Sequence, residues 1–128
     1  MSFLKKIFSN QEENQDHSKL EWIPITHIDQ LDYMISKSWE KPILIFKHST
    51  RCGISKMALK QFENGFSLPD QFAAYFLDLL EYREISNEIA ACFGVMHQSP
   101  QLIVIKNGVQ VHNASHSDIA AEELQQFV

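Results

Sequence analysis

The chain is poor in the residues that mark specialised protein classes. Its 128 residues include only two cysteines, four glycines and four prolines, too few for a disulfide framework, a collagen-like repeat or a low-complexity chain. Eleven basic residues stand against 16 acidic ones, and the lack of a basic surplus argues against nucleic acid or an anionic membrane as a partner. The longest uninterrupted apolar run, residues 72–77, is far shorter than the roughly 20 residues of a membrane helix.

The chain does have enough apolar material for one folded domain. Hydrophobic residues make up 45% of the sequence, which argues against intrinsic disorder. Because residues 9–19 hold no aliphatic or aromatic side chain, we divide the chain into an extension, residues 1–20, and a domain, residues 21–128. Four apolar residues of the extension have helical spacing and can form one or two amphipathic turns: Phe3, Leu4, Ile7 and Phe8. No secretory signal pattern is present, so we expect a cytoplasmic protein.

Two hydrophobic periodicities alternate along the domain and predict an α/β fold. Apolar runs that suit buried strands alternate with segments of amphipathic helical spacing. The predicted strands are residues 22–26, 42–46, 71–80, 101–105 and 109–112, and the predicted helices are residues 29–36, 53–64, 85–93 and 117–127. Asn107 and Gly108 are a strong hairpin signal, so the last two strands are antiparallel. We expect a central mixed β-sheet with helices on both faces.

Cys52 stands where a buried strand gives way to a helix, and this position predicts a reactive thiol. A helix start offers unpaired N–H groups, here those of Gly53 and Ile54, and a partial positive charge that favours a thiolate. Arg51 and Lys56 add positive charge nearby. The thiolate is the nucleophilic form of cysteine. The alternative is that Cys52 is only a small buried side chain.

Ser55, three residues after Cys52, indicates which thiol chemistry the site supports. A Cys-x-x-Cys motif has a resolving thiol at this position, which releases a mixed disulfide by internal attack. A serine can donate a hydrogen bond to the sulfur of Cys52, but an external thiol has to release the mixed disulfide. The sequence therefore predicts monothiol chemistry.

Other polar residues carry weaker signals. Cys92 shares a helical face with apolar residues, so we expect core packing, with an internal disulfide to Cys52 as the alternative. His48 ends a strand four residues before Cys52; we expect a solvated loop histidine, with tuning of the thiolate as the alternative. Asp78 interrupts an otherwise apolar strand and can be a strand-end residue that faces water. The six histidines lack the spacing of a zinc site, so we expect no metal.

Several strings of the sequence, in order, resemble known proteins. The Cys-x-x-Ser at a helix start, the strand ending at Asp78, the Ser99–Pro100 turn and the Lys-Asn-Gly of residues 106–108 resemble thioredoxin over roughly residues 22–127. More closely, residues 46–55 (FKHSTRCGIS), 97–101 (HQSPQ) and 114–119 (ASHSDI) resemble the YtxJ family of the bacillithiol system, the monothiol bacilliredoxins.

This resemblance implies a thioredoxin-like fold and a nucleophile at Cys52. It implies an enzyme that removes bacillithiol, or an equivalent low-molecular-weight thiol, from mixed disulfides on S-thiolated proteins. That thiol is then a co-substrate rather than a bound cofactor, and a disulfide reductase is a further candidate partner. Some relatives have a proline where this chain has Gly53, which affects the rigidity and redox tuning of the loop.

The resemblance also implies a substrate-binding edge. Pro100 would be cis and face Cys52, Ser99 would pair with an extended substrate, and Thr50 would also bind the substrate. In thioredoxin-like proteins an acid at the place of Asp78 can lie behind the active site, which is the alternative to a water-facing Asp78. The local sequence alone favours a trans Ser99–Pro100 bond. Two other functions stay open: a redox sensor or adaptor without turnover, and an iron–sulfur cluster carrier of the monothiol glutaredoxin type.

Overall fold

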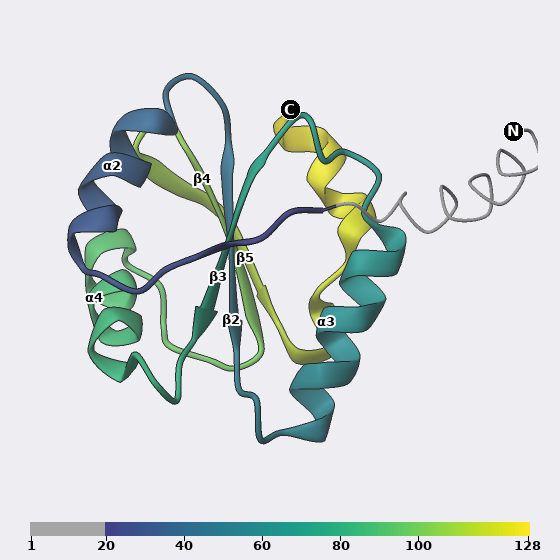
Figure 1. Cartoon of the computed structure of the whole chain (residues 1–128). Coiled ribbons are helices and arrows are strands. Elements are labelled where there is room, and N and C mark those ends of the chain that lie inside the picture. Colours follow the sequence, from purple (N-terminus) through teal and green to yellow (C-terminus); the bar gives the residue numbers. More distant parts are fainter. Residues whose placement is uncertain (1–19) are drawn as a thin grey trace, which may run out of the picture.

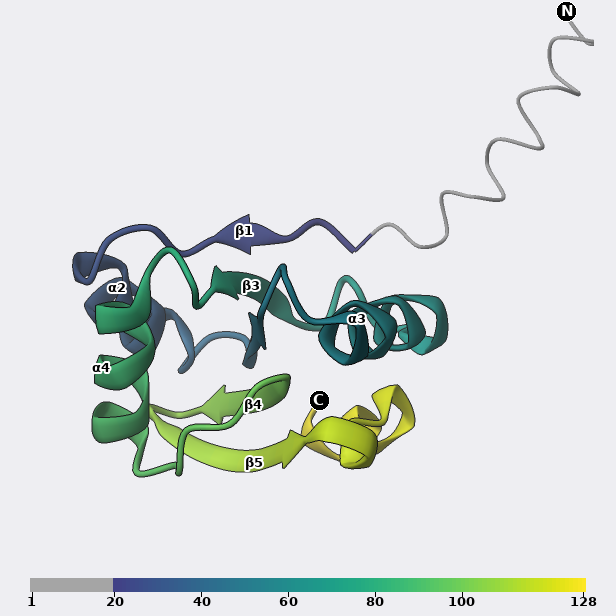
Figure 2. The ribbon, with the colours of Figure 1, turned by 90° about the horizontal axis from the view of Figure 1, so that it is seen from below.

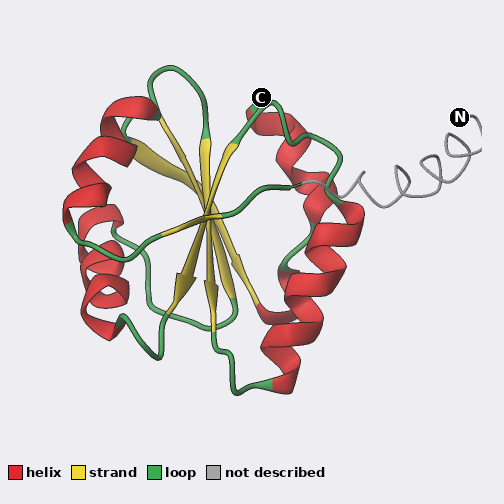
Figure 3. Ribbon diagram, in the orientation of Figure 1, coloured by secondary structure: helices red, strands yellow, loops and turns green. Residues whose placement is uncertain are grey.

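The computed structural model describes residues 20–128, and the amphipathic turns expected near Phe3 and Phe8 lie outside this range. Strands and helices alternate along most of the chain (Figure 3). In order they are β1 (Ile23–Pro24), α2 (Asp29–Lys37), β2 (Ile43–His48), α3 (Gly53–Gly65), β3 (Ala73–Asp78), α4 (Arg83–Phe93), β4 (Gln101–Lys106), β5 (Val109–Ser115) and the 3-10 helices η1 (His116–Asp118) and η2 (Ala121–Phe127).

The strands form one mixed sheet, as predicted. Their order across the sheet is β1-β3-β2-β4-β5. β1, β3 and β2 run parallel, whereas β4 is antiparallel to both β2 and β5. Helices α2 and α4 cover one face, and α3 with the C-terminal 3-10 segment covers the other (Figures 1 and 2). The expectation of helices on both faces is confirmed.

The central strand β2 links the two hydrophobic cores. All six of its residues are buried, and their side chains point alternately to the two faces. Its apolar members are Ile43 and Ile45 in the first core, with α2 and α4, and Leu44 and Phe46 in the second core, with α3 and η2. The last two residues, Lys47 and His48, are polar and yet equally buried. The end of β2 therefore places one buried polar side chain on each face of the sheet.

Two turn signals in the sequence work as predicted. Asn107 and Gly108 have φ of 54° and 81°, the positive values that a two-residue hairpin of type I′ requires. The N–H of Gly108 donates to Oγ of Ser38 at 2.8 Å, which fastens the hairpin to the end of α2. Gly94 ends α4 in the left-handed conformation, as glycine commonly does.

Several element boundaries differ from the prediction, most of all in β1, β5 and the C-terminal segment. Strand β1 is only two residues long, Ile23–Pro24; Pro24 has no N–H to donate, which limits pairing at this edge of the sheet. Strand β5 runs on to Ser115. The expected C-terminal helix is instead two 3-10 helices, because Ala121 and Leu124 both enter the second core and their spacing of three matches the 3-10 period.

Within residues 20–128, none of the helices has the length and apolar character needed to cross a membrane.

Candidate active site

Cys52 occupies the N-cap position of α3, at the start of the helix as predicted. Its backbone is extended, with φ −106° and ψ 123°, and its carbonyl oxygen accepts the N–H of Lys56 at 3.1 Å. The thiol is free and partly exposed. No acidic residue lies in the first turn of α3, so no carboxylate there opposes the positive end of the helix. The arrangement presents a partly exposed thiol at the start of a helix.

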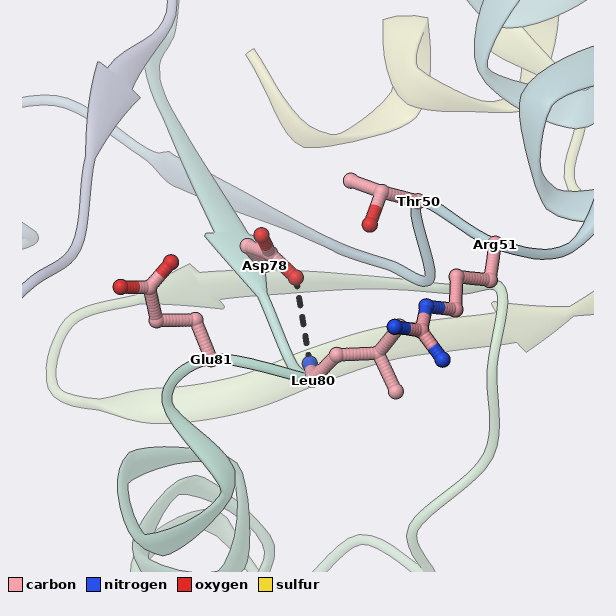
Figure 4. Close-up of a pocket in the computed structure, with 5 residues that line it drawn as sticks. All are labelled: Thr50, Arg51, Asp78, Leu80 and Glu81. Atoms are coloured by element: carbon pink, nitrogen blue, oxygen red, sulfur yellow. Dashed lines mark hydrogen bonds between the residues drawn. The ribbon is translucent and has the colours of Figure 1, made fainter.

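The loop before Cys52 contributes to a surface pocket. Thr50, Arg51, Asp78, Leu80 and Glu81 line this pocket, whose volume is about 450 Å³ (Figure 4). Oδ1 of Asp78 accepts the N–H of Leu80 at 3.1 Å. The structure therefore brings Arg51 and Thr50 together with Asp78, a half-buried residue at the end of β3.

Ser55 lies behind Cys52 and is 0% exposed. Its Oγ accepts the N–H of Ser49 at 3.1 Å and lies 2.7 Å from Nδ1 of His48. The hydroxyl oxygen of Ser55 accepts the hydrogen bond from Ser49, and the hydroxyl proton of Ser55 can donate to Nδ1 of a neutral His48. In the described part of the chain, no hydrogen bond joins Ser55 to the sulfur of Cys52. Ser55 thus ties the first turn of α3 to the end of β2.

The expectation that His48 is a solvated loop residue is wrong. His48 is the last residue of β2 and only 5% exposed, and its ring lies 5.4 Å from the ring centroid of Phe76. Burial lowers the pKa of His48, and the positive charge of Lys56 lowers it further, whereas the negative charge of Asp78 raises it. A neutral imidazole fits these surroundings. The sequence pattern missed this burial because the apolar run ends at Phe46.

The loop before β4 lies at the same end of the sheet as Cys52. Lys47 and Gln101 are partners across β2 and β4, so Pro100 lies beside the last residue of β2. The Ser99–Pro100 bond is cis, as the family resemblance implied and against the local expectation of trans. Pro100 is buried and its carbonyl oxygen accepts the N–H of His116 at 3.1 Å. Oγ of Ser99 is buried without a partner among the described residues.

A second buried polar cluster lies on the other face of the sheet. Lys47 is 0% exposed, and its Nζ donates to the carbonyl oxygen of Ser86 at 3.2 Å and lies 3.3 Å from Nδ1 of His97. Oγ of Ser86 lies 3.1 Å from the same ring nitrogen. Burial lowers the pKa of Lys47 to about 8. Sequence reasoning missed this cluster, although a lysine directly after four apolar strand residues was a visible signal.

Cys92 does not pack in the core as expected. It is exposed on α4, whereas Ile85, Ile89 and Phe93 are buried. These three are spaced by four residues, and Cys92 is turned about 100° away from Phe93 around the helix. Burial, Glu88 and Asp32 all raise the pKa of Cys92. Cys52 and Cys92 belong to helices on opposite faces of the sheet (Figure 1), and both are free.

No group of three or more histidine, cysteine, aspartate or glutamate side chains in residues 20–128 is arranged to hold a metal ion.

Comparison with known proteins agrees with the architecture. Residues 23–124 match the family model described as Monothiol bacilliredoxin BrxC. A solved thioredoxin-fold protein, described as a candidate oxidoreductase, is 33% identical with a TM-score of 0.73, over 86% of this chain and 96% of that one. Thioredoxin from Malassezia sympodialis is 23% identical (TM-score 0.63, 83% and 86% of the two chains). Thioredoxin from Schistosoma mansoni is 20% identical (TM-score 0.64, 84% and 96%). The fold is thioredoxin-like.

Proposed function

Because the chain belongs to the monothiol bacilliredoxin family, we propose that it is an enzyme that removes a low-molecular-weight thiol from S-thiolated proteins. Its family and its thioredoxin-like fold give it a thiol redox role. The single observation that carries the finer proposal is the position of Cys52. This thiol is reachable at a helix start, while the residue three positions later is a buried serine. The co-substrate is bacillithiol or an equivalent small thiol, and the setting is the cytoplasm.

The proposed reaction consists of two thiol–disulfide exchanges. The thiolate of Cys52 attacks the sulfur of the small thiol in the mixed disulfide, an S–S bond forms to Cys52, and the protein thiolate leaves. A second small-thiol thiolate then attacks the small-thiol sulfur bound to Cys52. This step releases a symmetrical small disulfide and regenerates the Cys52 thiolate. A disulfide reductase is a candidate partner for recycling that product.

The residues around Cys52 have distinct proposed roles. Arg51, Lys56 and the N–H groups of Gly53 and Ile54 stabilise the thiolate. Ser55 acts as a positioning residue, because its hydroxyl bonds to the end of β2 rather than to the sulfur.

The other side of the site is the proposed substrate edge. Ser99 and Pro100 form the edge that takes the extended substrate, with Thr50 across from them. The cis bond before Pro100 and the position of both loops at one end of the sheet support this assignment.

The test is a turnover assay on a carrier protein that has one S-thiolated cysteine. We expect the wild type to release the carrier thiol over many turnovers when the small thiol is in excess. Cys52→Ser should abolish the reaction, and the matched variant Cys92→Ser should retain the wild-type rate. Loss of activity in Cys92→Ser, with an intramolecular disulfide visible by mass spectrometry, would contradict the monothiol mechanism.

The same preparations test the two other functions. A redox sensor would react once with the mixed disulfide and would not recycle when more small thiol is added. An iron–sulfur carrier would be brown after anaerobic purification, and Cys52→Ser would lose the colour. We expect sustained turnover and a colourless protein.

A further inference from the structure

The pocket lined by Arg51, the residue before Cys52, lies where small ligands are commonly bound in α/β proteins. Strands β2 and β3 are parallel neighbours that end at His48 and Asp78, which are partners in the sheet. The pocket forms just beyond these two ends, from the loop after β2 and the turn after β3 (Figure 4). Ligands of α/β sheets typically bind outside the carboxyl ends of the strands. The volume of about 450 Å³ lies within the range of about 300–1,000 Å³ for small-molecule sites.

The lining of the pocket carries charges of both signs. Arg51 contributes a guanidinium group, and Asp78 and Glu81 contribute carboxylates. One oxygen of Asp78 accepts the N–H of Leu80, which leaves the other oxygen available. Within residues 20–128, neither Arg51 nor Glu81 takes part in an ion pair. In Figure 4 the Arg51 side chain lies toward Leu80, and the two carboxylates lie on the other side of Leu80.

The walls of the pocket are fixed to the sheet. The N–H of Leu79, between Asp78 and Leu80, donates to the carbonyl oxygen of His48 at 3.1 Å. The turn after β3 is closed by the N–H groups of Glu81 and Tyr82, which both donate to the carbonyl oxygen of Asp78. The carboxylate of Asp78 is therefore held in place before any ligand arrives, which lowers the entropy lost on binding.

We infer, on the basis of the function proposed above, that this pocket binds the charged part of the small thiol and selects a thiol that carries both an ammonium group and a carboxylate. Arg51 binds the carboxylate, because a guanidinium suits it geometrically. Asp78 and Glu81 bind the ammonium group. The lining has one more negative than positive charge, so it disfavours thiols that are only anionic. Cys52 directly follows Arg51 in the chain, so the reacting residue is one position away from a residue that lines the pocket.

The inference is tested with four mixed disulfides on one carrier cysteine. The small thiols are cysteine, with both charges; cysteamine, with only the ammonium; 3-mercaptopropionate, with only the carboxylate; and 2-mercaptoethanol, with neither. Second-order rate constants are divided by those of free dithiothreitol with the same substrates, which removes differences in intrinsic reactivity. We expect cysteine to react about tenfold faster than 2-mercaptoethanol, the size of one well-formed charged hydrogen bond.

Three variants identify the groups responsible. Arg51→Gln should remove the advantage of the carboxylate, and Asp78→Asn and Glu81→Gln should reduce the advantage of the ammonium. Since Arg51 also supports the Cys52 thiolate, the readout is the ratio of rates between substrates, in which a general loss of reactivity cancels. Arg83→Gln, which changes an exposed arginine outside this pocket, is the matched control and should keep the wild-type ratio.

Three results would contradict these proposals, and each contradicts a different part. Equal corrected rates for all four substrates would show that the pocket does not select the small thiol, while the proposed function stands. Absence of reaction with every mixed disulfide would overturn the proposed function itself. An equal change of ratio in Arg51→Gln and Arg83→Gln would attribute selectivity to overall charge and not to the pocket.

Discussion

Lys47 and His48 are neighbours on β2, and both are buried polar residues, but they serve opposite faces of the sheet. Lys47 reaches α4 through Ser86 and the loop before Pro100 through His97. His48 reaches the first turn of α3 through Ser55. One strand thus contacts, from its two faces, the first turn of α3 and the loop before Pro100.

The two clusters differ in what they cost to bury. The His48–Ser55 pair can be neutral, with Nδ1 of His48 and Oγ of Ser55 both hydrogen-bonded, so its burial is inexpensive. Lys47 brings an ammonium group into the protein, and within residues 20–128 it forms no ion pair with a carboxylate. The lowered pKa of Lys47 reflects the loss of water around this charge. The comparison indicates that the His48 side contributes to stability, whereas the charge on Lys47 works against it.

The largest expected effect is that of Lys47→Ala. Removing this long buried side chain leaves a cavity beside the first core, and we expect the free energy of unfolding to fall by about 2–4 kcal/mol. Lys47→Met keeps the volume and removes the buried charge, so it should be nearly neutral or stabilising. Ser86 and His97 keep their mutual hydrogen bond in both variants. Urea denaturation measures the change.

An exposed lysine is the control for this pair of variants. The side chain of Lys37 is 41% exposed and forms an ion pair with Glu40 at 3.2 Å. Such surface pairs contribute little, and Lys37→Ala should leave the urea midpoint unchanged. If Lys47→Met were as unstable as Lys47→Ala, the charge of Lys47 would be stabilising and the comparison would be wrong.

The next effect is that of Ser55→Ala on the other face. The variant leaves Nδ1 of His48 and the N–H of Ser49 buried without their partner, and we expect a loss of about 1–3 kcal/mol in the free energy of unfolding. The rate of Cys52 should fall as well, because the first turn of α3 loses its tie to β2. Ser67→Ala, at a position outside both clusters and exposed, is the control. A stable but unreactive variant would give Ser55 a direct role at the sulfur.

The smallest effect, counted per pH unit, is a pH dependence of stability that separates the two faces of the sheet. The pKa of Lys47 falls from 10.5 to about 8 on folding, so between these values the unfolded chain binds more protons than the folded one. Stability therefore rises with pH over this window, by at most about 1.4 kcal/mol per pH unit. Lys47→Met should lose this rise, and His48→Asn should keep it. Urea titrations from pH 7.5 to 10.5 make the measurement, and a flat wild-type profile would contradict the lowered pKa.

Local patterns in the sequence were sufficient for the elements that place Cys52. The apolar run before it and the helical spacing after it predicted the strand, the loop and the helix start, because each of these depends on neighbours along the chain. Asn107 and Gly108 predicted the hairpin for the same reason, since the turn requires positive φ at both positions.

The side-chain environments needed the fold. His48 was expected in solvent and is buried, because β2 runs two residues beyond its apolar stretch. Cys92 was expected in the core and is exposed, because one step around a helix turns a side chain by about 100°. The burial of His48 does not follow from local periodicity, since it depends on which neighbouring element covers that face. The exposure of Cys92 does agree with the four-residue spacing of the buried residues Ile85, Ile89 and Phe93.

By itself, the sequence determined the order of elements and placed a serine, not a second cysteine, three residues after Cys52, because both follow from residue type and spacing. Only the tertiary structure decided which polar groups share a site. Parallel pairing of β2 and β3 brought Arg51 to Asp78 from 27 positions away in the chain, and the sheet buried Lys47 and His48 on opposite faces. Contacts between distant segments depend on strand pairing and helix packing, which no local pattern encodes.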